Sequence, residues 1–85
     1  MNDDELIAQH IRCIPGHPGD ARVIETGVPV WVVIDYDLFV DGDAASISNS
    51  YGLSRDSIDA ARAYYRRHRD YIDATRLLKT APFLP

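Results

Sequence analysis

The sequence has a single cysteine and no long apolar run, and both scarcities limit what the protein can be. One cysteine cannot form an internal disulfide, which fits a reducing cytosol. No apolar run approaches the roughly 20 residues that a membrane-spanning helix needs. The acidic start, residues 1–5, lacks the basic region and apolar core of a secretory signal. These observations predict a cytoplasmic protein without a membrane partner.

Recognisable catalytic and cofactor motifs are also missing. The sequence shows no Ser-His-Asp set, Cys-His pair or phosphate-binding loop, and 85 residues leave little room for a closed pocket. We therefore predict one domain that is not an enzyme and carries no cofactor. A domain of this size buries only about 60% of the surface of its unfolded chain. Because self-association would add stability, we expect a homodimer or a higher homo-oligomer.

The potential metal ligands near the N-terminus have an unfavourable spacing. His10, Cys13 and His17, followed by Asp20, lack the paired Cys-x-x-Cys or His-x-x-x-His spacing of reliable zinc sites. We therefore predict no metal site. The expected alternative is a buried cysteine beside two histidines in a loop.

Positive charge is scarce in the first half of the chain and concentrated in the last third. The formal net charge of -4 disfavours a general nucleic-acid binder. Seven of the nine Lys and Arg residues are Arg55, Arg62, Arg66, Arg67, Arg69, Arg76 and Lys79. The acidic residues of the first half are Asp3, Asp4, Glu5, Asp20, Glu25, Asp35, Asp37, Asp41 and Asp43. This polarity permits pairing within one chain or between chains, and the sequence leaves both open.

The N-terminal segment, residues 1–29, is predicted to be extended or folded as a short β-hairpin. Two short apolar runs, residues 11–14 and 21–24, flank a loop with two prolines and two glycines. These residues break regular structure, and the loop is too long for a tight two-residue turn. Residues 1–9 form an acidic lead that is either frayed or helical.

Two periodicities compete in residues 28–41. Apolar residues occupy every even position from 28 to 40, an alternation rich in β-branched residues that favours a strand. Pro29 at a helix start and an apolar stripe through Val30 and Ile34 favour a helix instead. Periodicity by itself favours the strand.

Residues 44–63 have the spacing of a helix-turn-helix. Asp43 is placed to cap a short helix, Gly52 to end it in a left-handed conformation, and Ser54 to cap the next helix. The apolar positions that we expect to share one interior are Ile47, Tyr51, Leu53, Ile58 and Ala61. The predicted fold class is mainly α, with a tri-helical, homeodomain-like helix-turn-helix domain at residues 30–73.

A long C-terminal helix is predicted to follow. No glycine or proline interrupts residues 53–81, so we expect one long helix or two helices with a bend near Asp70. Pro82 ends the helical pattern. Residues 74–85 then comprise the end of this helix and a short apolar tail.

These features together resemble the bacterial domain-of-unknown-function family 433, some members of which are antitoxins of toxin–antitoxin pairs. The family has an extended N-terminal piece, an apolar helix, a glycine, the helix-turn-helix and a helix rich in Ala and Tyr. The matching residues are Val28, Pro29, Val30, Trp31, Tyr36, Gly42, Ile47, Tyr51, Leu53, Ser54, Ile58, Ala60, Ala61 and Tyr64. Gly27 stands where the family has an arginine. The resemblance covers roughly residues 10–73 and implies a helix at residues 30–40.

The resemblance implies an antitoxin-like protein that neutralises a PIN-type ribonuclease toxin and, as a dimer, binds operator DNA. The residues that would face a DNA groove are Ser54, Arg55, Ser57, Asp59 and Arg62. Arginine reads guanine well, but phosphates would repel Asp56 and Asp59. The same residues also suit a capped, solvated helix start that contacts no DNA.

The basic and aromatic C-terminal part is the predicted partner surface. Its residues are Tyr64, Arg66, Arg67, Arg69, Arg76, Leu77, Leu78, Lys79 and Phe83. A cation beside leucines could dock in the toxin and enter the acidic, metal-binding site of a PIN ribonuclease. Alternatively, the tyrosines and leucines close the core or a homodimer interface, while the arginines pair with Asp70 and Asp73. The protein would then be a non-catalytic homo-oligomeric interaction module that uses the helix-turn-helix only as scaffold.

Overall fold

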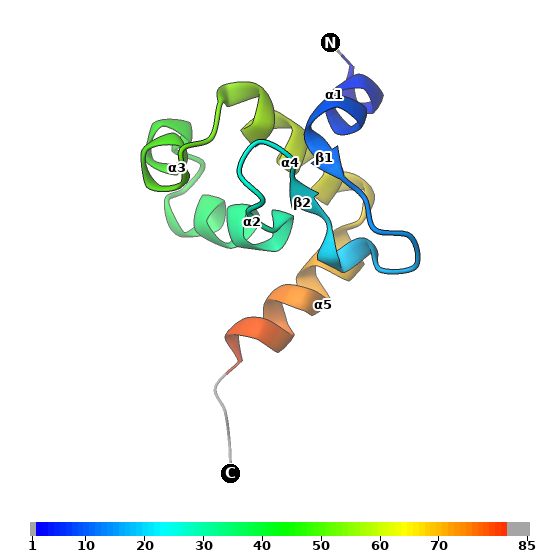
Figure 1. Ribbon diagram of the computed structural model, residues 1–85. Helices are drawn as coiled ribbons and strands as arrows, with labels where there is room; N and C mark the ends of the chain where they lie inside the picture. Colours follow the sequence, from blue (N-terminus) through cyan, green and yellow to red (C-terminus); the bar gives the residue numbers. More distant parts are fainter. Residues whose placement is uncertain (1, 82–85) are drawn as a thin grey trace.

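The computed structural model describes residues 2–81, which fold into five α-helices and one two-stranded antiparallel sheet (Figure 1). The elements follow in the order α1 (Asp3–His10), β1 (Ile11–Arg12), the short 3-10 helix η1 (Pro18–Asp20), β2 (Arg22–Val23), α2 (Val30–Phe39), α3 (Ala44–Tyr51), α4 (Arg55–Arg67) and α5 (Arg69–Thr80). The predicted mainly helical fold with a small N-terminal hairpin is confirmed. None of the helices in this part is long and apolar enough to span a membrane.

The N-terminal segment folds as α1 followed by the hairpin. The acidic lead is helical because the Asn2 side chain accepts a hydrogen bond from the backbone N–H of Glu5 at 2.8 Å, which caps α1. In the sheet, Ile11 lies opposite Val23, and both side chains are buried. The hairpin thus contributes one apolar face to the core, although each strand has only two residues.

Residues 30–39 form the helix α2, as the family resemblance implies and against the strand alternation. Pro29 precedes the helix with φ −61°, the angle that its ring imposes, and so starts it. Val30, Val33 and Ile34 lie on one face and are buried, whereas Leu38 is 54% exposed. A strand could not bury this set on one side, so packing against the core decides the conformation.

The predicted caps of α3 and α4 are confirmed. The Asp43 carboxylate accepts hydrogen bonds from the backbone N–H groups of Ala45 and Ser46 at 3.1 and 3.4 Å. Gly52 ends α3 with φ 66°, which glycine adopts without a steric penalty. The Ser54 hydroxyl accepts the backbone N–H of Ser57 at 3.2 Å and so begins α4.

The expected shared interior of α3 and α4 exists. Four of the five predicted residues are buried in the core cluster, namely Ile47, Leu53, Ile58 and Ala61. Tyr51 is partly buried against the cluster, and its ring meets the edge of Tyr36 with centroids 5.3 Å apart. The interior therefore extends over α2, α3 and α4 together.

The C-terminal helical region is divided into two helices rather than one. His68 separates α4 from α5 with φ −128°, two residues before the predicted bend. Ile72 is fully buried and holds the start of α5 on the core. A Cβ atom at Gly19 would lie 2.2 Å from the Thr75 hydroxyl oxygen, so η1 packs directly on α5. Beyond that contact, α5 extends away from the other helices (Figure 1).

Candidate partner and nucleic-acid surfaces

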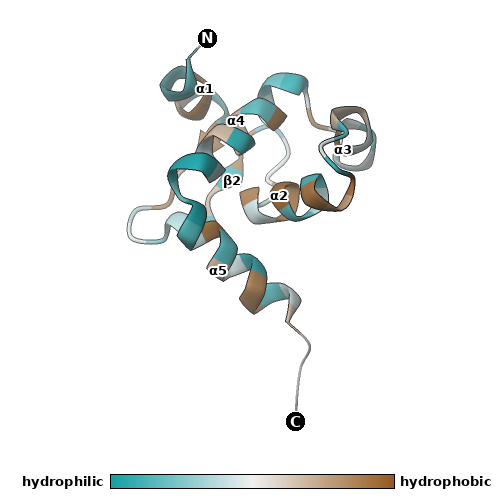
Figure 2. Ribbon diagram, turned by 180° about the vertical axis from the view of Figure 1, so that it is seen from behind, coloured by the Kyte–Doolittle hydropathy of each residue, from teal (hydrophilic) through white to brown (hydrophobic). Residues whose placement is uncertain are grey.

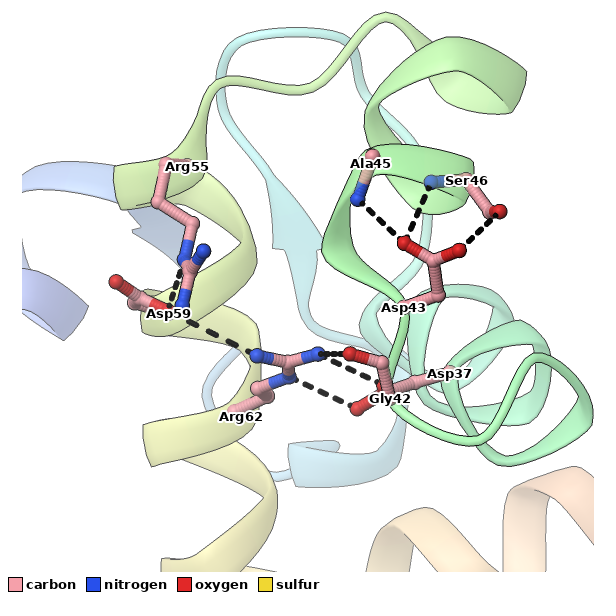
Figure 3. Close-up of polar contacts among 8 residues, drawn as sticks. All are labelled: Asp37, Gly42, Asp43, Ala45, Ser46, Arg55, Asp59 and Arg62. Carbon is pink, nitrogen blue, oxygen red and sulfur yellow. Dashed lines mark hydrogen bonds and ion pairs between the residues drawn. The ribbon is translucent and has the colours of Figure 1, made fainter.

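The predicted DNA-facing surface consists of α3, the start of α4 and the turn between them. Ala44, Ala45, Ser48, Arg55 and Ile58 line an open hollow of about 260 Å³ between the two helices. Arg55 is the one cation of this lining. Its side chain is 68% exposed, and its Nε donates to Asp59 at 3.1 Å (Figure 3). Arg55, the residue best suited to read a base, is thus already paired with Asp59 one helical turn away.

Arg62, predicted to contact DNA, instead holds two helices together. Its Nε and Nη2 donate to the two carboxylate oxygens of Asp37, both at 2.9 Å, and Nη2 also reaches the Gly42 carbonyl at 3.2 Å (Figure 3). The side chains are only 23% and 17% exposed, and the bonds to Asp37 raise the pKa of Arg62 above its ordinary value. This corrects the prediction, because the guanidinium is committed to the fold.

The start of α4 is engaged by a residue that the sequence patterns did not single out. The Glu25 carboxylate accepts hydrogen bonds from the Ser54 backbone N–H at 3.2 Å, the Ser54 hydroxyl at 2.9 Å and the Ser57 hydroxyl at 2.6 Å. Ser57 is fully buried. The prediction that Ser57 faces a DNA groove is therefore corrected, and Ser54 has its hydroxyl bound to a carboxylate.

These hydrogen bonds make the stability of the fold depend on the ionisation of Glu25, and therefore on acid pH. The hydrogen bonds from Ser57, and then those from Ser54, lower the pKa of Glu25 below its ordinary 4.5. The stabilisation is therefore complete above pH 4.5 and is lost as the pH falls through the lowered value. We expect Glu25→Gln to lower the urea midpoint at pH 7, with a difference from wild type that shrinks towards pH 3. Urea titrations at stepped pH, with Ser57→Ala for comparison, check this, and a difference independent of pH would contradict it.

The charge on this face is predominantly negative. Its exposed or partly exposed acidic residues are Glu25, Asp43, Asp56 and Asp59, whereas its cation Arg55 is paired. Phosphate neutralisation by free cations supplies most of the affinity of a DNA-binding surface. The surface formed by α3 and the start of α4 therefore offers little attraction to a phosphate backbone.

The predicted basic–aromatic patch at residues 64–71 separates into core and surface residues. Tyr64 is 2% exposed, and its hydroxyl donates to the Pro18 carbonyl at 2.8 Å, so it is a core residue and not a partner contact. Tyr65 is partly buried against the core, and its hydroxyl donates to Asp73 at 2.8 Å. Of the two neighbouring tyrosines, Tyr64 is thus the more deeply buried.

The arginines that follow pair with α1 and not with the predicted acidic neighbours on their own helix. Arg66 lies 3.1 Å from Asp3, and Arg67 forms an ion pair with Asp4. Arg69 carries its guanidinium 5.3 Å from the centroid of the Tyr65 ring. Acidic and basic residues from the two halves of the sequence therefore pair within the chain, which is one of the two arrangements that the sequence permits.

The end of α5 carries the remaining predicted partner residues. Arg76 is 23% exposed and bridges Asp35 of α2 at 3.2 Å and Asp73 at 3.1 Å, so it fixes α5 to the fold. Leu77 and Leu78 are 69% and 80% exposed. Figure 2 shows the hydrophobic colour on this lower part of α5. Lys79 is exposed beside the leucines, and the predicted contact residue Phe83 lies outside the described residues.

The cysteine segment differs from its prediction in two respects, the first being that His10 is the last residue of α1 and does not lie in the loop. Cys13 is exposed and not buried. Among residues 2–81, no three His, Cys, Asp or Glu side chains are grouped so that they could hold a metal ion. His10 has a buried Nε2 atom without a hydrogen-bond partner.

Comparison with known proteins does not identify a relative. No protein-family model matches the chain, and no curated protein or solved structure is significantly similar to it. Membership of family 433 is therefore a proposal that depends on the matching residues and on the arrangement described above.

Proposed function

We propose that this chain is an antitoxin-like, non-catalytic protein that binds a PIN-type ribonuclease toxin through the end of α5. The observation that carries the proposal is the pair of exposed leucines, Leu77 and Leu78, on a helix end that extends away from the body. Adjacent, strongly exposed leucines on a small domain indicate a surface that a protein partner covers.

The end of α5 is presented in a fixed orientation. Ile72 is buried in the core and Arg76 is tied to Asp35, so the helix is anchored both five residues and one residue before Leu77. A binding element that is already helical loses less conformational entropy on association than a flexible tail. Lys79 follows the leucines directly and would supply the cation for an acidic, metal-binding active site.

The helix-turn-helix serves as scaffold in this proposal. A homeodomain-like arrangement is supported by the left-handed Gly52 between α3 and α4 and by the Ser48 hydroxyl, which donates to the Leu53 carbonyl at 2.8 Å across the turn. The acidic surface around Arg55 counts against base reading. The function is therefore assigned to α5 and not to α4.

The proposal is tested by replacing both leucines with aspartate. We expect Leu77→Asp with Leu78→Asp to weaken binding of the toxin encoded by the neighbouring gene about a hundredfold, because two apolar anchors are lost. Co-expression should then fail to rescue growth from the toxin. Pull-down and calorimetry with a catalytically inactive toxin measure the binding directly.

A matched control variant has the same net charge as the double-leucine variant. Gln9→Asp with Asn49→Asp adds two carboxylates at exposed positions on α1 and α3 and should leave binding unchanged. Equal binding by the leucine variant and this control would refute the proposal. Analytical sedimentation of the free protein tests the alternative function, a homo-oligomeric interaction module. That alternative requires a stable oligomer, and the double-leucine variant should dissociate it.

Operator binding is the second function that the family resemblance implies, and the charge on α4 predicts its outcome. We expect the protein to shift its upstream DNA no more tightly than nonspecific DNA, with a Kd on the order of 10 µM or weaker. Gel shifts at two salt concentrations measure this. A tight, salt-sensitive complex that weakens in Arg55→Ala would instead assign DNA reading to α4.

A further inference from the structure

The junction between α4 and α5 carries a second charged surface that is distinct from the leucines of α5. An open hollow of about 270 Å³ is lined there by Arg66, Arg67, His68, Arg69, Asp70 and Tyr71. Tyr71 is 59% exposed. Three guanidinium groups and an exposed ring around one hollow form a surface suited to an anionic partner, because arginine binds carboxylates in a directed, two-pronged geometry.

Two of the three arginines already bind carboxylates, and those carboxylates come from α1. Asp3 and Asp4 in the first turn of α1 reach Arg66 and Arg67, which lie 63 residues further along the chain. All four side chains are substantially exposed, between 41% and 78%. Exposed ion pairs of this kind are individually weak and are screened by salt.

The helix α1 packs on α4 through side chains that stay in partial contact with water. It contains no buried residue, and its apolar attachment consists of the partly buried Leu6 and Ile7. Arg69, by contrast, lies over Tyr65 and forms no ion pair with any of residues 2–81. At one edge of this surface, Arg66 and Arg67 are therefore paired with exposed carboxylates of α1 that a competing anion can replace. Arg69, beside the hollow, has no such carboxylate among residues 2–81.

We propose that the α4–α5 junction is a docking surface for the acidic first turn of a helix in a partner protein, and that α1 is its internal competitor. The argument is charge complementarity. The occupant seen in the structure is a short helix with Asp3, Asp4 and Glu5 in its first turn, so this surface accepts carboxylates at that spacing. A partner helix with the same pattern would displace these residues and engage Arg69 as well.

A protein helix fits this surface better than a nucleic-acid backbone does. The chain has a net charge of -4, and Asp70 lies in the lining of the hollow itself. A long polyphosphate would meet this negative charge on either side of the arginines. A single acidic helical turn needs only the contacts that Asp3 and Asp4 already make with Arg66 and Arg67. The proposal does not depend on the toxin, because it concerns residues other than those at the end of α5.

The test uses the whole protein and a defined probe. The probe is a fluorescein-labelled, alanine-rich helical peptide that begins with the sequence SDDE, and its matched control begins with SNNQ. Fluorescence anisotropy at low salt measures binding. Neutralising the competitor with Asp3→Asn and Asp4→Asn should tighten binding of the acidic peptide about fivefold, because two exposed ion pairs no longer oppose it.

Two further variants make the result specific. Asp20→Asn with Asp41→Asn changes the net charge equally at exposed sites away from α1 and should not tighten binding. Arg66→Ala with Arg67→Ala, added to the neutralised variant, should abolish binding. Circular dichroism confirms that each variant is folded.

Three outcomes would overturn the proposal. The first is equal affinity of wild type and the α1 variant for the acidic peptide. The second is binding that survives the loss of Arg66 and Arg67. The third is tighter binding of a single-stranded oligonucleotide with the same number of charges, which would assign the junction to nucleic acid instead.

Discussion

Replacing Tyr64 with alanine is expected to lower the free energy of unfolding by about 4 kcal/mol, the largest effect of any single change considered for this protein. The Tyr64 ring is 2% exposed within the core, and its centroid lies 4.3 Å from that of the His68 ring. Truncation leaves a cavity where α4 meets the start of η1. Because small domains have only about 5–15 kcal/mol of stability, a loss of this size should lower the urea midpoint at 25 °C by a large fraction.

The hydroxyl of Tyr64 contributes separately and is tested with phenylalanine. Tyr64→Phe leaves the Pro18 carbonyl without its donor and should cost about 1 kcal/mol. Burial raises the pKa of Tyr64 to about 12 from its ordinary 10, with a smaller contribution from Cys13. The folded state thus loses stability as the pH rises from 10 to 12. The phenylalanine variant should lack this part of the alkaline decline, and identical alkaline profiles would contradict the assignment.

Removing the Arg62 side chain should cost about 2 kcal/mol, the second largest effect. Arg62→Ala leaves the Asp37 carboxylate, which is 17% exposed, without its two-pronged partner. It also frees the Gly42 carbonyl in the turn between α2 and α3. The cost should stay below that of breaking a fully buried pair, because both side chains retain some contact with water. Urea unfolding of the wild type and the variant measures the difference.

The matched control for Arg62 is Arg55, on the same helix. Arg55→Ala removes an exposed i, i+4 pair with Asp59 and should change stability by no more than about 0.5 kcal/mol. Arg62→Lys should fall between the two because lysine cannot make the two-pronged contact. If the Arg62 and Arg55 variants were equally stable, the Asp37 pair would not hold α2 to α4.

Local signals in the sequence were sufficient to predict both caps of α3 and the N-terminal cap of α4. Asp43, Gly52 and Ser54 each act on a backbone group within four residues, so their roles depend little on the rest of the chain. The conformation of residues 30–39 needed more than periodicity. Its alternation is typical of a strand, whereas Pro29 at its start and the burial of Val30, Val33 and Ile34 on one face favour the helix.

The candidate sites could not be predicted as well, because their bonds join residues far apart in the sequence. Glu25 meets Ser57 across 32 residues, and Arg62 meets Asp37 across 25. No spacing rule along one helix anticipates such pairs. The sequence therefore predicted that Arg62 and Ser57 are exposed on a helix, whereas in the fold both side chains form hydrogen bonds within the chain. The predicted leucines of α5 are exposed because no distant partner among residues 2–81 covers them.

The ion pairs between α1 and the end of α4 also bear on how the protein is made. During synthesis, the segment with Asp3 and Asp4 leaves the ribosome long before Arg66 and Arg67 are translated. Until then, α1 has neither its charged partners nor the surface of α4 to rest on, and an isolated helix of eight residues is unstable in water. The helix α1, although translated before α4, should consequently fold only after α4 has emerged.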